Sequence, residues 1–290
     1  MINPRPSRRH VLLSALGIAG ALPSSGEEPK IEVPAYNRMS DDDEIKLGQE
    51  AAAGIEKEKN LKFIDTPEIH QYVADLFQKL SKSCRRANIP YSIKIVDTAE
   101  INAFALPGGF VYLNRGLLEW ARSESELAGV LGHEVGHVVG RHGANAVARM
   151  TATSSLLSEA SRILLGTDSP AKLLMQIGGP VALLALLKYT RTQELEADLL
   201  GFYNVQRAGY HPQGMVDLFK HFGEKSNSAE SLFAVLSSHP APADREAQVT
   251  QEMKKFPPAG TLSHDSEAFK SVQARLKQMP RPKVQDKLTP

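Results

Sequence analysis

The order of apolar and polar positions along the chain predicts helices around a small group of strands. Apolar residues recur at helical spacing from Pro67 onward, which predicts an amphipathic helix with proline at its first position. The run 91–96 alternates and is rich in β-branched residues, as is typical of a strand. The runs 101–106 and 110–114 predict two further extended segments, joined at 107–109 as a hairpin or a sharply turned strand pair.

A long helical pattern follows these strands. It covers Leu117–Ala148 in two pieces, and Ser123 with Glu126 forms a capping box that predicts the start of the second piece. Another helix is predicted over Thr190–Gln206, and a shorter amphipathic one over Phe269–Met279. The expected fold class is therefore α+β and predominantly α-helical, with a small β-sheet or hairpin.

Residues 1–21 have the layout of an export signal peptide. Arg5, Arg8 and Arg9 precede the uncharged run Val11–Leu22, which is shorter than the ~20 residues that span a bilayer. The adjacent arginines are typical of a twin-arginine signal, and an ordinary secretory signal is the alternative. Either one predicts a protein that is periplasmic or otherwise exported, and soluble after the signal is cleaved.

The rest of the chain divides into three parts. We expect a linker at 22–39, a single folded domain at 40–255 and a partly disordered tail at 256–290. Within the domain, the uncharged run 173–187 is interrupted by Gly-Gly-Pro, so it is too short to span a membrane. Buried helices or a helical hairpin over the active site are expected there, and peripheral membrane contact is the alternative.

The amino-acid composition limits the kinds of partner and metal site that the chain can have. The chain has 290 residues with 34 Lys and Arg against 33 Asp and Glu, so it lacks the basic excess of a nucleic-acid-binding protein. Its single cysteine excludes an internal disulfide framework, a four-cysteine zinc site and an iron–sulfur cluster. A bound metal would therefore need ligands from the nine histidines and the carboxylates.

The segment His133-Glu134-Val-Gly-His137 has the spacing of a zinc site. Residues four apart lie on one face of a helix, so His133 and His137 can bind the same ion. Glu134 lies at the edge of that face, where its carboxylate can accept a proton from water without being a ligand. Two glycines, Gly132 and Gly136, would let another element pack closely against this helix.

A third ligand is expected from the acidic segment that begins at Glu194. Glu194 and Asp198 share one helix face, so Glu194 can bind the metal while Asp198 accepts the outer N–H of a ligating imidazole. A solvated acidic face is the alternative. Glu196 points elsewhere and His142 lies five residues after His137, off the metal-binding face, so neither is expected to take part.

Several motifs occur in the order of a known family. They are Asn102-Ala-Phe-Ala-Leu-Pro-Gly-Gly109, the His133 motif with Arg141-His142-Gly143, Glu194-x-Glu-Ala-Asp198, and His239-Pro240 with Arg245. Over roughly residues 40–250 the chain resembles the HtpX and CAAX-prenyl-protease family of gluzincin metallopeptidases, in particular its soluble periplasmic branch. Long membrane-spanning helices between the two metal motifs are missing here, and the chain after His239 is too short for the tetratricopeptide repeats of that branch.

The resemblance implies a zincin-type catalytic domain with one Zn²⁺ per chain. By position it implies His133, His137 and Glu194 as zinc ligands, Glu134 as catalytic acid and base, and Asp198 behind a ligand. It also makes His239 and Arg245 candidate catalytic residues. His239 could approach the metal or the oxyanion, and Arg245 could pair with an acid such as Asp198 or with substrate.

These features predict a zinc-dependent metalloendopeptidase that acts on misfolded or unassembled envelope proteins. The polypeptide substrate is expected to bind as an extended strand along an exposed edge formed by Phe110, Val111, Tyr112 and Leu113, with a plain structural hairpin as the alternative. The alternative function is an envelope chaperone or assembly factor with a latched, rarely active zinc site.

Overall fold

The computed structural model describes residues 30–31, 33–153, 188–224, 239 and 242–282. The expected signal peptide at 1–21, the apolar run 173–187 and the end of the expected tail lie outside the described residues. No helix within these ranges is long and apolar enough to cross a membrane.

The fold is α+β and mostly helical, as predicted. Its helices are α1 (Asp41–Glu56), α2 (Pro67–Ser83), α3 (Arg115–Trp120), α4 (Glu124–Val139), α5 (His142–Thr153), α8 (Arg191–Arg207), α9 (Gln213–Glu224), α11 (Pro242–Lys255) and α12 (Glu267–Gln278). Its strands are β1 (Ser92–Val96), β2 (Ala103–Ala105) and β3 (Phe110–Asn114). The helical pattern from Leu117 to Ala148 forms three pieces instead of two, because the chain turns again between α4 and α5, where Arg141 has a φ of 56°.

The strands form one mixed sheet in the order β1-β3-β2. β1 is parallel to β3, and β2 pairs with β3 in antiparallel register through the turn at 107–109, which confirms the predicted turned strand pair. Because β3 is bonded on both sides, the expectation that Phe110, Val111, Tyr112 and Leu113 offer a free edge is wrong. Among the described residues, the unpaired edge that lies against α4 belongs to β2.

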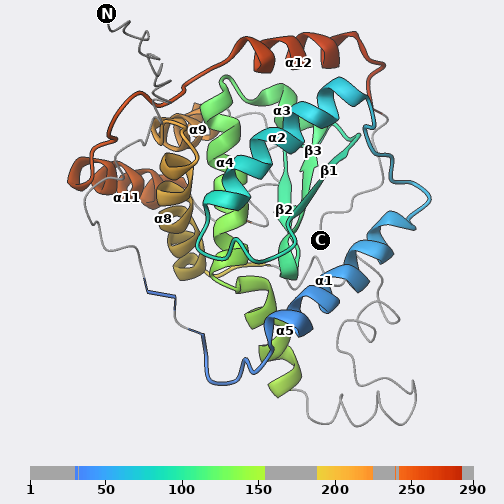
Figure 1. Ribbon diagram of the computed structural model, residues 1–290, viewed down its shortest axis with the longest axis vertical. Helices are drawn as coiled ribbons and strands as arrows, with labels where there is room; N and C mark the ends of the chain where they lie inside the picture. The colour runs from blue at the N-terminus through green and yellow to red at the C-terminus, as the bar shows by residue number, and fades with distance from the viewer. Residues whose placement is uncertain (1–29, 32, 154–187, 225–238, 240–241, 283–290) are drawn as a thin grey trace, which may run out of the picture.

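Helix α4 runs through the middle of the molecule. Figure 1 shows it between the sheet on one side and α8 and α9 on the other. α8 lies directly against α4: a Cβ at Gly136 would stand 2.4 Å from the Ala197 carbonyl oxygen, and one at Gly132 would stand 2.5 Å from Val205. The predicted role of these glycines in close packing is confirmed, and it sets α8 beside the helix that carries the two histidines.

The C-terminal amphipathic piece is α12. It begins after the Ser266 cap and buries Phe269, Val272 and Leu276 in the same core as α2 and α4. Arg115, which is 2% exposed, donates from its guanidinium to the carbonyl oxygen of Leu276 at 2.7 Å. α12 is therefore fastened to the folded domain across α2 and α3 (Figure 1).

Candidate metal centre

Helix α4 places His133 and His137 one turn apart with both rings buried. The two Nε2 atoms lie 2.9 Å from each other. Burial lowers the pKa of each ring, and for His133 the nearby Arg245 charge lowers it further, which favours the neutral imidazole that binds metals. The i, i+4 spacing thus brings two nitrogen donors to one point.

Helix α8 supplies a carboxylate at the same point. Glu194 is fully buried, with its oxygens 3.5 Å from His133 Nε2 and 3.4 Å from His137 Nε2. Burial would raise its pKa, but the surrounding histidines hold the pKa well below its ordinary value, so the carboxylate is ionised. This arrangement is the one that the spacing of the two motifs predicts.

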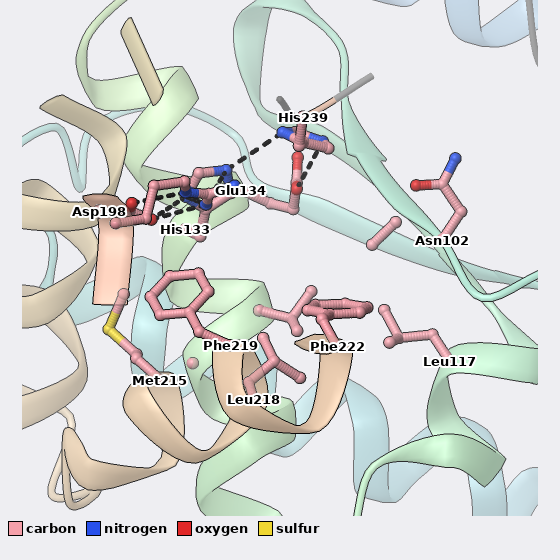
Figure 2. A pocket seen from close by; sticks show the side chains of 14 residues that line it. Asn102, Leu117, His133, Glu134, Asp198, Met215, Leu218, Phe219, Phe222 and His239 are labelled. Atoms are coloured by element: carbon pink, nitrogen blue, oxygen red, sulfur yellow. Dashed lines mark hydrogen bonds and ion pairs between the residues drawn. The ribbon is translucent and has the colours of Figure 1, made fainter. Parts of the chain in front are cut away.

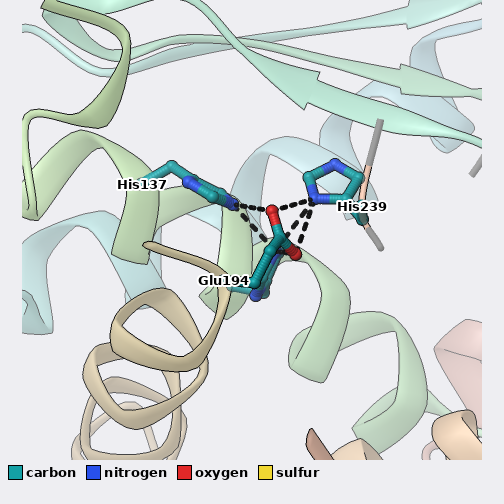
Figure 3. Close-up of side chains that lie close together, drawn as sticks. His137, Glu194 and His239 are labelled. Carbon is teal, nitrogen blue, oxygen red and sulfur yellow. Dashed lines mark hydrogen bonds and ion pairs between the residues drawn. The ribbon is translucent and has the colours of Figure 1, made fainter. Parts of the chain in front are cut away.

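His239 brings a fourth donor to the cluster. Its Nδ1 lies 3.0 Å from Glu194 Oε1, as Figure 3 shows, and 3.3 Å from His133 Nε2. Although burial lowers the pKa of His239, Glu194 raises it above its ordinary value, so His239 is the ring that its neighbours favour as a cation. Of the alternatives left open by the sequence, the structure shows His239 beside the metal ligands.

The donor set fits a zinc ion. One ligand atom from each of His133, His137, Glu194 and His239 lies within 4.8 Å of the others. A tetrahedron with Zn–N and Zn–O bonds of about 2.1 Å has edges of roughly 3.4 Å. In five of the six pairs among these four residues, the nearest ligand atoms lie 2.9 to 3.5 Å apart. Nitrogen and carboxylate oxygen are also the ligand types that zinc accepts when cysteine is absent.

Glu134 lies beside the cluster without joining it. It is 1% exposed, and its Oε1 is 3.6 Å from His239 Nε2. Burial raises its pKa to about 7, and a hydrogen bond from the Ala105 backbone N–H opposes that rise. Its Oε2 has no hydrogen-bond partner in the described part of the chain, so one carboxylate oxygen is left to bind a water or substrate group.

Asp198 and Arg245 hold the ligands in place. His133 Nδ1 donates to Asp198 Oδ1 at 2.8 Å, while Arg245 donates to both Asp198 oxygens at 2.7 Å and reaches Glu194 Oε2 at 2.9 Å. Burial would raise the pKa of Asp198, but Arg245 and His133 lower it below its ordinary value. Of the two roles left open for Arg245, the structure shows the pair with Asp198.

Two residues near the cluster were not expected there. His142 Nδ1 lies 2.8 Å from His137 Nδ1, and His142 Nε2 lies 3.2 Å from Glu196 Oε2. His142 is not in the ligand cluster, as its expected place off the metal-binding face implies. The expectation that it takes no part is wrong because it assumed an unbroken helix, whereas the turn at Arg141 brings His142 back to His137. The glycine at position 140, typical of a helix end, is the sequence signal that could have indicated this turn.

A mainly apolar cleft opens beside Glu134. It has a volume of about 460 Å³ including its open mouth, and Figure 2 shows His133, Glu134 and His239 along its polar side. Its apolar side consists of Leu117, Val130, Met215, Leu218, Phe219 and Phe222. Asn102 lies at the cleft, and within the described ranges its Oδ1 has no hydrogen-bond partner.

Comparison with known proteins agrees with this geometry. The chain is 29% identical over 255 residues to a protein named putative beta-barrel assembly-enhancing protease from Vibrio cholerae, covering 85% of this chain and 52% of that protein. It is 29% identical over 239 residues to the beta-barrel assembly-enhancing protease of Escherichia coli, covering 80% and 49%. With the mitochondrial metalloendopeptidase OMA1 of Schizosaccharomyces pombe it shares 26% identity over 265 residues, covering 86% and 76%.

These similarities extend over most of this chain, which spans about half the length of the beta-barrel assembly-enhancing relatives. The family model for peptidase family M48 matches residues 65–253, from the start of α2 to α11. That match contains the sheet, both metal motifs, His239 and Arg245. The chain therefore belongs to peptidase family M48, a family of metallopeptidases, as the resemblance implied.

Proposed function

We propose that the chain is a zinc metalloendopeptidase that cleaves misfolded or unassembled envelope proteins. The observation that carries this proposal is the meeting of His133, His137 and Glu194 at one buried point, with the free Glu134 oxygen beside it. These three residues would hold the zinc ion. The names of the relatives, which include assembly-enhancing proteases, support the same class of activity.

Bound zinc would supply a Lewis acid that polarises the scissile carbonyl and makes water more acidic. Glu134 takes a proton from the attacking water at its free Oε2 and then delivers it to the leaving amine. A pKa of about 7 suits both steps, because the group can accept and release a proton near neutral pH. Asp198 keeps the His133 proton on Nδ1, so that Nε2 retains a lone pair with which it could bind the metal.

The substrate binds along the β2 edge in this proposal. Leu106 N–H donates to Phe110 O and Asn114 N–H donates to Asn102 O, so the even-numbered residues of this segment bond to β3. The backbone groups of Ala103 and Ala105 then face away from β3, toward α4. An extended peptide can pair there with the backbone of Ala103 and the carbonyl oxygen of Ala105, since the Ala105 N–H is already bonded to Glu134. Such pairing uses the main chain and requires no particular side chains.

The apolar lining of the cleft next to Glu134 supports the proposal that misfolded proteins are the substrates. A side chain adjacent to the scissile bond would enter it, and its apolar lining would favour bulky apolar residues. Folded proteins bury such residues, whereas unfolded and unassembled chains expose them. We further propose that the protein is exported by its predicted signal, by the twin-arginine or the general secretory route. For the run 173–187, helices buried over the active site are the first expectation, and peripheral membrane contact is the alternative.

The alternative function has one observation in its favour. A catalytic zinc site keeps one position open, and His239 brings a fourth donor to the cluster. A zinc site that is closed by a fourth protein ligand, and therefore rarely active, would suit an envelope chaperone or assembly factor. Unchanged complementation of an envelope phenotype by Glu134→Gln would favour that alternative over proteolysis.

The proposed activity is tested with an unfolded protein as substrate. Wild type and Glu134→Gln should each bind one zinc ion, and only wild type should cleave, since the variant keeps the ligands and loses the proton acceptor. Cleavage is followed by gel and mass spectrometry, and zinc by metal analysis of the same preparations. Equal turnover by the two proteins contradicts the assigned role of Glu134.

A further inference from the structure

The outer nitrogen of His137 faces a second histidine. His137 Nε2 points to the donor cluster, while its Nδ1 lies 2.8 Å from Nδ1 of His142. Each of these residues is 1% exposed. At this distance in a buried site, one ring nitrogen must carry a proton and the other must offer a lone pair.

The position of every proton follows if His137 binds metal through Nε2. The lone pair of His137 is then on Nε2, so its proton is on Nδ1 and is donated to Nδ1 of His142. His142 must carry its own proton on Nε2, which lies 3.2 Å from Glu196 Oε2. The carboxylate of Glu196 is an acceptor, so each hydrogen bond in the row has one donor and one acceptor.

The backbone is shaped to hold His142 in this place. A Cβ at Gly140 would lie 2.5 Å from His142 Nε2, so a larger residue there would displace the ring. Arg141 has the left-handed φ of 56°, a conformation that non-glycine residues rarely adopt. Its guanidinium donates to Glu44 at 2.9 Å and to the Met39 carbonyl oxygen at 2.6 Å, which ties the turn to α1.

Tyr189 also contacts His137, but it cannot replace the hydrogen bond between His137 and His142. Its ring is stacked on the His137 ring at a centroid distance of 3.8 Å and an angle of 19°. Stacking restricts the plane of the imidazole, yet it offers no acceptor to Nδ1. The choice of tautomer is left to the hydrogen bond with His142.

We propose that His142 and Glu196 are positioning residues that fix the tautomer and orientation of His137 as a metal ligand. This inference rests on the proposed function, in which His137 binds zinc. The three acids of the Glu194 segment then serve one metal centre in different ways. Glu194 is a metal ligand, and Asp198 accepts a hydrogen bond from the ligand His133. Glu196 acts on the ligand His137 through a hydrogen bond from His142. Partners of this kind typically change metal affinity by about 10–100-fold.

The first test compares two substitutions at one position. His142→Phe removes the acceptor and keeps a ring, so its zinc dissociation constant, measured by competition with a chelator, should rise about 10–100-fold. His142→Asn places a carbonyl oxygen near the site of Nδ1, so its affinity should return toward the wild-type value. The visible spectrum of the cobalt-substituted protein should change for His142→Phe and resemble wild type for His142→Asn, because it reports ligand geometry.

The second test addresses Glu196. Glu196→Ala removes the last acceptor and should weaken zinc binding, whereas Glu196→Gln keeps an acceptor oxygen and should weaken it less. Tyr203→Phe is the matched control, since it removes a side-chain hydrogen bond to Glu252 from the same helix away from the cluster. Circular dichroism and thermal unfolding of the metal-free proteins show which variants are folded.

A measurement on wild type does not depend on the folding of any variant. In the zinc-loaded protein with ¹⁵N-labelled histidine, NMR should show His137 protonated at Nδ1 and His142 protonated at Nε2. The opposite tautomer of His142 overturns the proposal, as does wild-type zinc affinity with an unchanged cobalt spectrum in folded His142→Phe. If wild type itself binds no zinc, the proposed function fails instead, so the two failures are distinguishable.

Discussion

Arg245 is the cation around which the buried carboxylates of the metal centre are arranged. It contacts both oxygens of Asp198 and one oxygen of Glu194, and it is 8% exposed. Burial alone would lower its pKa, but Asp198 and Glu194 raise the pKa above its ordinary value, so the guanidinium stays charged. A planar fork of donors can satisfy both carboxylates at once, which a lysine ammonium cannot do.

Arg245→Lys should therefore weaken both folding and metal binding. One carboxylate oxygen that was hydrogen-bonded would be left buried without its partner, at a cost of about 1–3 kcal/mol in the free energy of unfolding. Denaturant unfolding and a zinc titration measure the two effects. Arg275→Lys, at an exposed position on α12, is the control and should match wild type. Wild-type stability and affinity in Arg245→Lys would show that the fork geometry is unimportant.

The contact between α4 and α8 sets the distance between the two metal motifs. Gly136 lies against the backbone of Ala197. Ala197 is one residue before Asp198 and three residues after Glu194. Any side chain at this position must push α8 away from α4. Because Gly136 has no side chain, α8 can lie close enough to α4 for Glu194 to reach the two histidines.

Gly136→Ala should destabilise the protein by about 1–3 kcal/mol, as overpacking does in a well-packed core. The helices would separate and carry Glu194 away from the histidines, so zinc affinity should fall as well. Gly129→Ala on the same helix meets the Met215 side chain at 2.9 Å and backbone atoms only at 3.3 Å, whereas Gly136→Ala meets backbone at 2.4 Å, so the loss for Gly129→Ala should be smaller. Chemical unfolding of the two variants checks the order, and equal losses would contradict it.

Helix α9 forms most of the apolar side of the cleft beside Glu134. Leu218 is buried and lines this cleft, while Lys220 on the same helix is exposed. Leu218→Phe should narrow the cleft and lower kcat/KM for peptides with a bulky apolar residue next to the scissile bond, relative to peptides with a small one. Lys220→Ala should leave that ratio unchanged. A ratio that Leu218→Phe does not alter would place the side-chain pocket elsewhere.

At the scale of the whole molecule, the sequence predicts the elements better than their order in space. The helix class, the turned strand pair and the shared helix face of His133 and His137 follow from local spacing, which depends on neighbouring residues. The meeting of the two metal motifs is a long-range contact, and it was predictable because a zinc site needs a third ligand. The central place of β3 depends on pairing with β1, which is distant along the chain, and no local pattern specifies it. The contact between His142 and His137 does not follow from the sequence for a related reason, because one left-handed residue, Arg141, interrupts a pattern that otherwise continues as helix.

The central claim is that one zinc ion is held by His133, His137 and Glu194. Anomalous X-ray diffraction from crystals of the zinc-loaded protein, recorded on both sides of the zinc absorption edge, tests it directly. The account predicts one strong zinc peak per chain between the Nε2 atoms of the two histidines and the Glu194 carboxylate. A fully folded protein without such a peak, or with its zinc bound elsewhere, would contradict the account.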